Sequence, residues 1–211
     1  MYKLYKPYLD IDFVKSKCEL IHYFGLGFIQ IKLQGYRRLH IYTGAFPVTT
    51  EHPHNHRYGL NAVVIWGKLK QTIFKEEKGF THLLSYVNCG SDQVVPNVRV
   101  PCSLEVVSEM VLSSGSSYYL HSDSLHTVES NSAITLLSVE SNPLARKPYA
   151  QVVIPVGQED TCPFLHTVEE KDLWEIVEIK LKEALMEFEG EKLREALLEF
   201  ESEKLKEAPN E

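Results

Sequence analysis

About ten short runs of apolar or alternating residues constrain the fold of this chain more than any other feature. Gly, Pro, Ser and Asn separate the runs, and these residue types favour turns. Short alternating runs at close spacing are typical of antiparallel strands. The sequence therefore predicts a mainly β fold, either an antiparallel sandwich or a barrel. The expected strands are residues 28–33, 38–42, 62–66, 69–74, 81–87, 104–112, 117–120, 127–128, 133–139 and 150–154.

Helices are expected at both ends of this β region. Asp12 would cap a short N-terminal helix over residues 14–23, and Gly25 would end it. Strong helix formers dominate residues 169–207, where the stretch KLKEALMEFEGE is followed by the similar stretch KLREALLEFESE. We therefore expect two parts. Residues 1–168 would form the β domain with an N-terminal extension, and residues 169–211 would form an acidic helical tail.

The repeat rotates the apolar face of the tail helix along its length. A repeat of twelve residues turns a helix face by about 120°. The first apolar stripe would consist of Trp174, Val177, Leu181, Leu185 and Phe188, and the second of Leu193, Leu197 and Phe200. Either the helix bends near Gly190 or the two stripes meet different partners. We expect one face to pack on the body, with self-association into a homo-oligomer as the alternative.

The formal net charge of −7 is unevenly distributed. Residues 1–168 hold 15 basic and 14 acidic residues, whereas residues 169–211 hold 7 basic and 15 acidic ones. An acidic balance argues against binding to nucleic acid. No apolar run approaches the roughly 18 residues of a membrane span, and the N-terminus lacks the layout of a signal peptide. The four cysteines are widely spaced at Cys18, Cys89, Cys102 and Cys162. This spacing is typical of reduced thiols in a cytoplasmic protein, with a disulfide between two of them as the alternative.

The densest chemical feature is the stretch EHPHNHR, which spans residues 51–57. Alternate residues of a strand share a face, so His54 and His56 can point together into a barrel. Imidazole nitrogen is a good ligand for iron, nickel, zinc or copper. Two ligands make a weak site, and the segment 117–131 offers His121 and His126 as candidates for a third.

These residues resemble the two motifs of the cupin superfamily. His54-x-His56 matches the start of the first motif, with Leu60 at its Glu position and Gly67 at its closing Gly. Gly115 and His126 match the second motif, in which His121 takes the position of a Pro. The resemblance covers residues 36–155 and implies a cupin-like antiparallel β-barrel, or jelly roll.

Leu60 leaves the motif with three histidines and no carboxylate, a pattern similar to the thiol dioxygenase branch, of which cysteine dioxygenase is a member. GKLKQTIF at residues 67–74 and LHTVESN at residues 125–131 also resemble that branch. The resemblance implies a non-haem Fe(II) held by His54, His56 and His126, with Ni, Zn or Mn as other candidates. It further implies O₂ and a small substrate, such as a thiol, at the open positions.

Other candidate site residues follow from alternation along residues 38–42. Arg38, His40 and Tyr42 share one face, with Leu39 and Ile41 opposite. If the polar face points inward, Arg38 and His40 can bind an anionic substrate and Tyr42 can place a hydroxyl near the metal. Otherwise these residues lie outside.

Arg57 and Tyr118 complete the candidates, for substrate binding and for catalysis respectively. The function we expect is a metal-dependent cupin dioxygenase acting on a small polar substrate. The alternative is a non-catalytic cupin-like protein that binds a small ligand, or a scaffold that assembles through its acidic helix.

Overall fold

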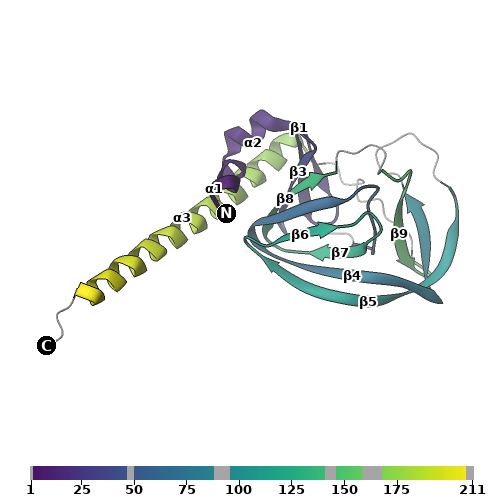
Figure 1. Ribbon diagram of the computed structural model, residues 1–211. Coiled ribbons are helices and arrows are strands. Elements are labelled where there is room, and N and C mark those ends of the chain that lie inside the picture. Colours follow the sequence, from purple (N-terminus) through teal and green to yellow (C-terminus); the bar gives the residue numbers. More distant parts are fainter. Residues whose placement is uncertain (1, 47–49, 88–95, 141–145, 159–167, 208–211) are drawn as a thin grey trace.

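The computed structural model of the chain describes residues 2–46, 50–87, 96–140, 146–158 and 168–207, except for the side chains of residues 2–3, 195–197 and 200–207. Within these ranges, short helices lie at the N-terminus, nine strands form the body and one long helix follows (Figure 1). The helical elements are α1 (Tyr2–Tyr5), η1 (Lys6–Leu9), α2 (Ile11–Lys17) and α3 (Glu170–Glu207). The strands are β1 (Cys18–Phe24), β2 (Phe28–Leu33), β3 (Arg37–Tyr42), β4 (Leu60–Val87), β5 (Arg99–Ser113), β6 (Ser117–Leu120), β7 (Leu125–Glu129), β8 (Ala133–Val139) and β9 (Ala150–Pro155).

The prediction of a mainly antiparallel β fold is confirmed. Three expected strands match β2, β6 and β8 residue for residue. The main difference is β4, a single strand of 28 residues that contains the three expected runs 62–66, 69–74 and 81–87. The glycines between those runs do not end the strand, because neighbouring strands pair with it on both sides of each one.

The sheet is organised around β4. Its strand order is β1-β2-β3-β8-β4-β5, and β6, β7 and β9 each pair with β4 as well. Residues 60–67 of β4 pair with β6 and β8, whereas residues 68–87 pair with β5, β7 and β9. Among the described strands, no pairing joins β1 to β5, so the sheet is not closed and the expected barrel is not confirmed.

Gly67 lies where β4 passes from one set of partners to the other. Its φ is +78°, a region that side chains disfavour. A Cβ at this position would lie 2.3 Å from the Ser132 carbonyl oxygen. The glycine at the end of the first motif is therefore required by the close approach of the turn before β8.

The N-terminal helix differs from the prediction in its cap and its end. Asp10, not Asp12, is the cap, and its Oδ1 accepts a hydrogen bond from the Phe13 N–H at 2.8 Å. The helix α2 ends at Lys17, and residues 18–24, expected to be mostly helical, form β1 instead. The reason is tertiary, because β1 buries Ile21 and Tyr23 at alternating positions and pairs with β2.

The main hydrophobic core lies between one face of the sheet and the helices. Ile29, Ile31, Leu39 and Ile41 of β2 and β3 are fully buried there. The core residues contributed by α3 are Leu173, Val177, Leu181 and Ala184. The face that α3 buries therefore includes Leu173 and Ala184, which the predicted stripe lacked, whereas Trp174 and Leu185 are only half-buried. Trp66 of β4 packs against this core, and its Nε1 donates to Glu187 Oε2 at 2.7 Å.

The remainder of α3 leads away from the body as one uninterrupted helix through Gly190 (Figure 1). Leu193 is 75% exposed there, while the side chains of Leu197 and Phe200 lie outside the described residues. Self-association through this segment stays a prediction. Within the described part of the chain, no helix is long and apolar enough to cross a membrane.

Cys18 and Cys102 are free thiols, whereas Cys89 and Cys162 lie outside the described residues.

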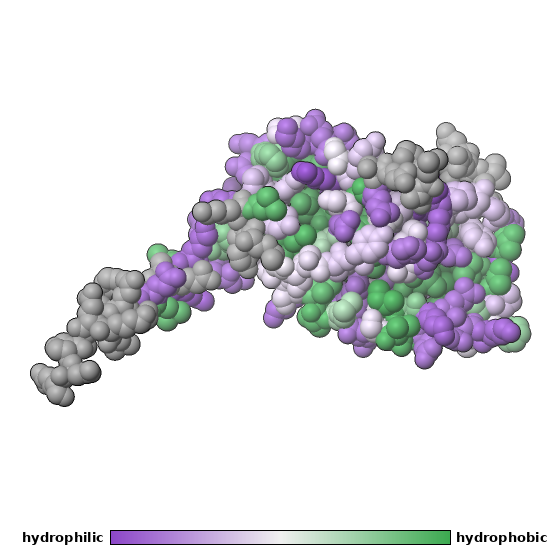
Figure 2. Space-filling view, in the orientation of Figure 1, coloured by the Kyte–Doolittle hydropathy of each residue, from purple (hydrophilic) through white to green (hydrophobic). Residues whose placement is uncertain are grey.

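Apolar side chains are exposed on β5, the last strand in the strand order of the sheet. They include Val106, Val107 and Val111. Figure 2 shows hydrophobic residues gathered over the region of β4 and β5.

The docking of α3 can be tested with two identical substitutions on the same helix. Leu181 is 1% exposed, so Leu181→Ala should lower the free energy of unfolding by about 2–5 kcal/mol. Leu193→Ala, at an exposed position, should change it by less than about 0.5 kcal/mol. Urea unfolding followed by circular dichroism measures both values. Equal losses in the two variants would contradict the packing of α3 on the sheet.

Candidate metal centre

The segment that carries His54 and His56 lies between β7 and β9. His54 and His126 exchange two backbone hydrogen bonds, with N···O distances of 3.1 and 2.9 Å. On its other side, His54 forms a bridge to Val152 of β9. Asn55 holds Gln151, because its Nδ2 donates to Gln151 Oε1 at 2.6 Å and its Oδ1 accepts the Gln151 N–H at 2.7 Å. The backbone thereby fixes two of the candidate ligands directly opposite each other.

The three expected ligands converge in the structure. One ligand nitrogen from each of His54, His56 and His126 lies within 4.8 Å of the others. The ring centroid of His126 lies 4.7 Å from that of His54 and 5.0 Å from that of His56. The centroids of His54 and His56 are 5.2 Å apart. Three imidazoles in this arrangement could hold one metal ion.

Hydrogen bonds to carbonyl oxygens set the tautomers of two of these rings. His54 Nδ1 lies 3.1 Å from the His52 carbonyl oxygen, and His126 Nδ1 lies 3.0 Å from that of Ser124. A carbonyl oxygen only accepts, so each Nδ1 carries the proton and donates it. In a neutral imidazole the Nε2 lone pair is then free to bind a metal, the orientation found in protein metal sites.

Burial keeps the three imidazoles neutral. It lowers the pKa of His54, and it lowers that of His126 to about 3, with proximity to His54 as a second cause. The pKa of His56 lies well below its ordinary value, first through burial and then through its two neighbours. A neutral ring is the form that coordinates a metal, so protons compete only weakly for these nitrogens.

Glu51 is a buried carboxyl beside this cluster that the sequence reasoning did not select. Its Oε2 accepts the Val128 N–H at 2.6 Å, and its Oε1 lies 3.8 Å from His54 Nδ1. Burial raises the pKa of Glu51 to about 8. Its place at the start of EHPHNHR was the available signal, but nothing in the sequence showed that its side chain turns inward.

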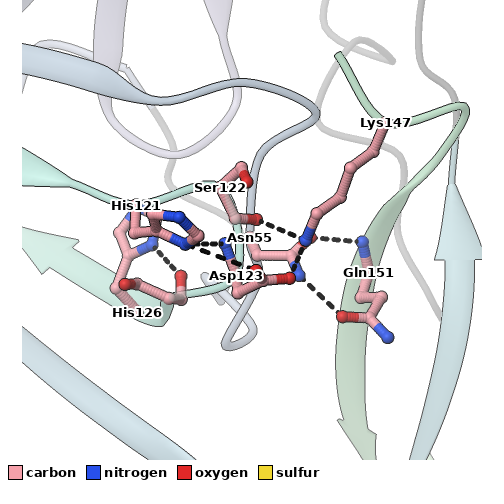
Figure 3. A network of polar contacts seen from close by, with 8 residues as sticks. Asn55, His121, Ser122, Asp123, His126, Lys147 and Gln151 are labelled. Atoms are coloured by element: carbon pink, nitrogen blue, oxygen red, sulfur yellow. Dashed lines mark hydrogen bonds and ion pairs between the residues drawn. The ribbon is translucent and has the colours of Figure 1, made fainter. Parts of the chain in front are cut away.

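His121, the alternative third ligand, points away from the triad. Its Nδ1 accepts the Asp123 N–H at 3.2 Å, and its side chain is 61% exposed. Lys147 binds Asp123 and also donates to the Ser122 carbonyl oxygen at 3.2 Å (Figure 3). This network holds the loop before β7, so His121 and Asp123 lie in a structural contact outside the triad.

The other predicted site residues line the same cavity, whose volume is about 320 Å³. They are Arg38, His40, Tyr42, Arg57 and Tyr118. The polar face of β3 therefore points inward, and Leu39 and Ile41 belong to the core opposite. Burial raises the pKa of Tyr118 to about 12 and that of Tyr42 well above its usual value. Both hydroxyls consequently keep their protons at neutral pH.

The cavity also contains residues that the sequence reasoning missed, among them Gln30, Lys32 and Tyr58. Gln30 Nε2 lies 3.0 Å from His40 Nε2 and donates to it, since burial keeps that ring neutral. Gln30 and Lys32 alternate with the buried Ile29 and Ile31, which was the available signal. Recognising it required knowing that β2 pairs with β3.

Comparisons with known proteins give little further information. No family model matches the chain, and no curated protein matches it. The X-ray structure of E. coli ycfD matches with 11% sequence identity and a TM-score of 0.29. That match covers 72% of this chain and 39% of the ycfD chain. A likeness this weak supports no conclusion about fold or function, and the resemblance to cupins is not confirmed by it.

The lowered pKa of His126 predicts a loss of stability in acid for the metal-free protein. The folded value of about 3 lies below the ordinary 6.5, so the unfolded chain takes up the proton first as the pH falls. This group alone should lower the free energy of unfolding by about 2 kcal/mol between pH 7 and pH 5.

Urea unfolding in a chelating buffer at the two pH values measures this loss. Wild-type protein should lose about 2 kcal/mol more than His126→Gln over this interval. His121→Gln, the matched control at an exposed histidine, should behave like wild type. An equal loss in wild type and His126→Gln would contradict the burial of a neutral ring.

Proposed function

We propose that the chain is a metal-dependent enzyme in which His54, His56 and His126 hold one ion, and that it acts as an Fe(II) dioxygenase on a small polar substrate such as a thiol. The observation that carries the proposal is the convergence of three imidazoles within 4.8 Å. Two of them are fixed as Nδ1–H tautomers by carbonyl oxygens. A histidine cluster without a ligand would not need its Nε2 lone pairs held free in this way.

The donor set fits a first-row transition metal. Neutral imidazoles suit iron, nickel, copper and zinc, and the choice among them depends on geometry and availability. Leu60, at the position of the motif's Glu, is 2% exposed in an apolar cluster and offers no ligand. The ligands would then all be neutral, which favours binding of an anionic substrate group.

In the proposed reaction the cavity residues bind substrate and hold protons. Fe(II) with open positions would supply the redox chemistry that a dioxygenase needs. Arg38 and Arg57 would bind an anionic group of the substrate. Neutral His40, whose Nε2 accepts from Gln30, would donate its Nδ1–H to the substrate. Tyr42 and Tyr118 would orient O₂ or donate a proton, a role suited to hydroxyls that stay protonated at neutral pH.

We also propose a family and a location for this chain. The mainly antiparallel sheet, Gly67 at its turn and the three histidines together support a cupin-like jelly roll of the thiol dioxygenase type. The cytoplasmic location indicated by the cysteine spacing belongs to the same proposal.

The second candidate is a non-catalytic cupin-like protein that binds a small ligand, or a scaffold. It is favoured by the part of α3 beyond Glu189, where the charged helix continues away from the body (Figure 1). A scaffold would not depend on the triad, so metal content distinguishes the two candidates.

Metal analysis of the purified full chain tests the proposal. After anaerobic addition of iron, the wild-type protein should retain about one ion per chain. His54→Ala should lose it, because two imidazoles remain. His121→Ala, the matched control at a histidine outside the triad, should retain it. Absence of bound metal in wild type, or its retention by His54→Ala, would refute the site.

Oxygen consumption then tests the reaction. Iron-loaded wild-type protein should consume O₂ when supplied with a panel of small thiols, and His54→Ala should not. Bound iron without consumption of O₂ on any thiol of the panel would refute the thiol dioxygenase assignment and leave the metal site standing.

A further inference from the structure

The cavity wall formed by β2 and β3 changes its chemistry from one end to the other. Directly paired residues on this wall are Phe28 with Tyr42, Gln30 with His40, and Lys32 with Arg38. All six side chains line the cavity. Successive pairs lie about 7 Å apart along the strands, so the aromatic pair and the cationic pair are separated by about 13–14 Å of strand.

One end of this wall is apolar. Phe28 and Tyr42 belong to a buried cluster against which Phe24, Leu26 and Val128 pack. The Phe24 and Phe28 rings are stacked, with centroids 5.0 Å apart and planes at 8°. Each of these five residues also lines the cavity. The cluster therefore offers an aromatic surface to a ligand, as well as packing the fold.

The other end of the wall is cationic. Lys32 and Arg38 stand directly opposite each other on neighbouring strands, an arrangement that costs stability. Glu19 acts on Lys32 from a distance, but among the described residues neither cation forms an ion pair. Arg38 instead lies over the Tyr58 ring at 5.2 Å, and Arg146 lies 5.7 Å from the same ring. An anion between Lys32 and Arg38 would offset their mutual repulsion.

The histidine triad lies between the two ends. Val128, in the apolar cluster, follows His126 by two residues on the same face of β7. Tyr58, at the cationic end, follows His56 by two residues and stacks on its ring, with centroids 6.1 Å apart and planes at 8°. His126 thus adjoins the apolar end and His56 adjoins the cationic end. A ligand that reaches both ends would therefore lie beside the triad.

We propose that the cavity takes an amphipathic organic anion, an arylalkanoate in its simplest form. Its aromatic or branched apolar group lies against Phe28, Tyr42 and Val128, and its anionic group lies between Lys32 and Arg38. The atoms that join the two groups lie beside His54, His56 and His126. The claim that this anion is a substrate rests on the proposed function. Such a substrate is larger than a free amino-acid thiol. A cavity of about 320 Å³ lies within the range of roughly 300–1,000 Å³ for small-molecule sites.

Titration calorimetry on the metal-free full chain tests the proposal with three probes. The probes are 3-phenylpropanoate, the neutral 3-phenylpropan-1-ol and acetate. Phenylpropanoate should bind about tenfold or more tightly than either of the others, because only it uses both ends of the cavity. Equal binding of the alcohol, or equal binding of acetate, would overturn the proposal. This comparison requires no variant.

Substitutions then assign the two ends. Lys32→Gln and Arg38→Gln should each weaken phenylpropanoate binding about tenfold and leave the alcohol unchanged. Phe28→Leu should weaken the binding of both phenylpropanoate and the alcohol. Arg37→Gln is the matched control, because Arg37 is exposed and its Nη1 donates to the Tyr8 hydroxyl outside the cavity. Unchanged phenylpropanoate affinity in folded Lys32→Gln and Arg38→Gln would overturn the proposal.

The calorimetric comparison of the three probes does not depend on whether the protein binds a metal. If wild-type protein binds no iron but prefers phenylpropanoate as expected, the enzyme proposal fails and the ligand class stands. If iron binds through His54 but the three probes bind alike, the ligand class fails and the metal site stands.

Discussion

Backbone pairing along both edges of β4 is the constraint on which the rest of the structure depends. A strand of 28 residues would leave many N–H and C=O groups without partners unless neighbours followed it throughout. Five strands pair with most of its length, with β8 and β6 at its start and β5, β7 and β9 further on. The His54 segment in turn bridges β7 and β9. The triad is therefore held in place by β7 and β9, which themselves pair with β4.

The two faces of the β2–β3 pair have different roles, one in the hydrophobic core and the other in the cavity. One face packs on α3 and contains fully buried isoleucines and leucines. The other face carries the polar and aromatic side chains of the cavity. Because the first face supplies the hydrophobic burial, the second can place Gln30, His40 and Lys32 beside the candidate metal centre. Polar groups at that position would be costly if they had to form the core themselves.

Much of this architecture was accessible from the sequence, and the limits have physical causes. Local alternation predicted β2, β6 and β8 residue for residue, and the spacing of the motifs predicted that His126 joins His54 and His56. Local propensity failed at residues 18–24, because pairing with β2 outweighed it. The inward turn of Glu51 and the pairing of Lys32 with Arg38 depend on contacts between distant segments, which a single sequence does not reveal.

The contact between Trp66 and Glu187 has an optical consequence. The chain contains two tryptophans, and both lie where α3 meets the remainder of the molecule. Trp66 reaches the helix from β4, and Trp174 lies on the helix beneath the Lys15 ammonium at 5.4 Å. Neither is among the residues that line the cavity. Tryptophan fluorescence, excited apart from that of the tyrosines, therefore reports how the long helix packs on the remainder of the molecule.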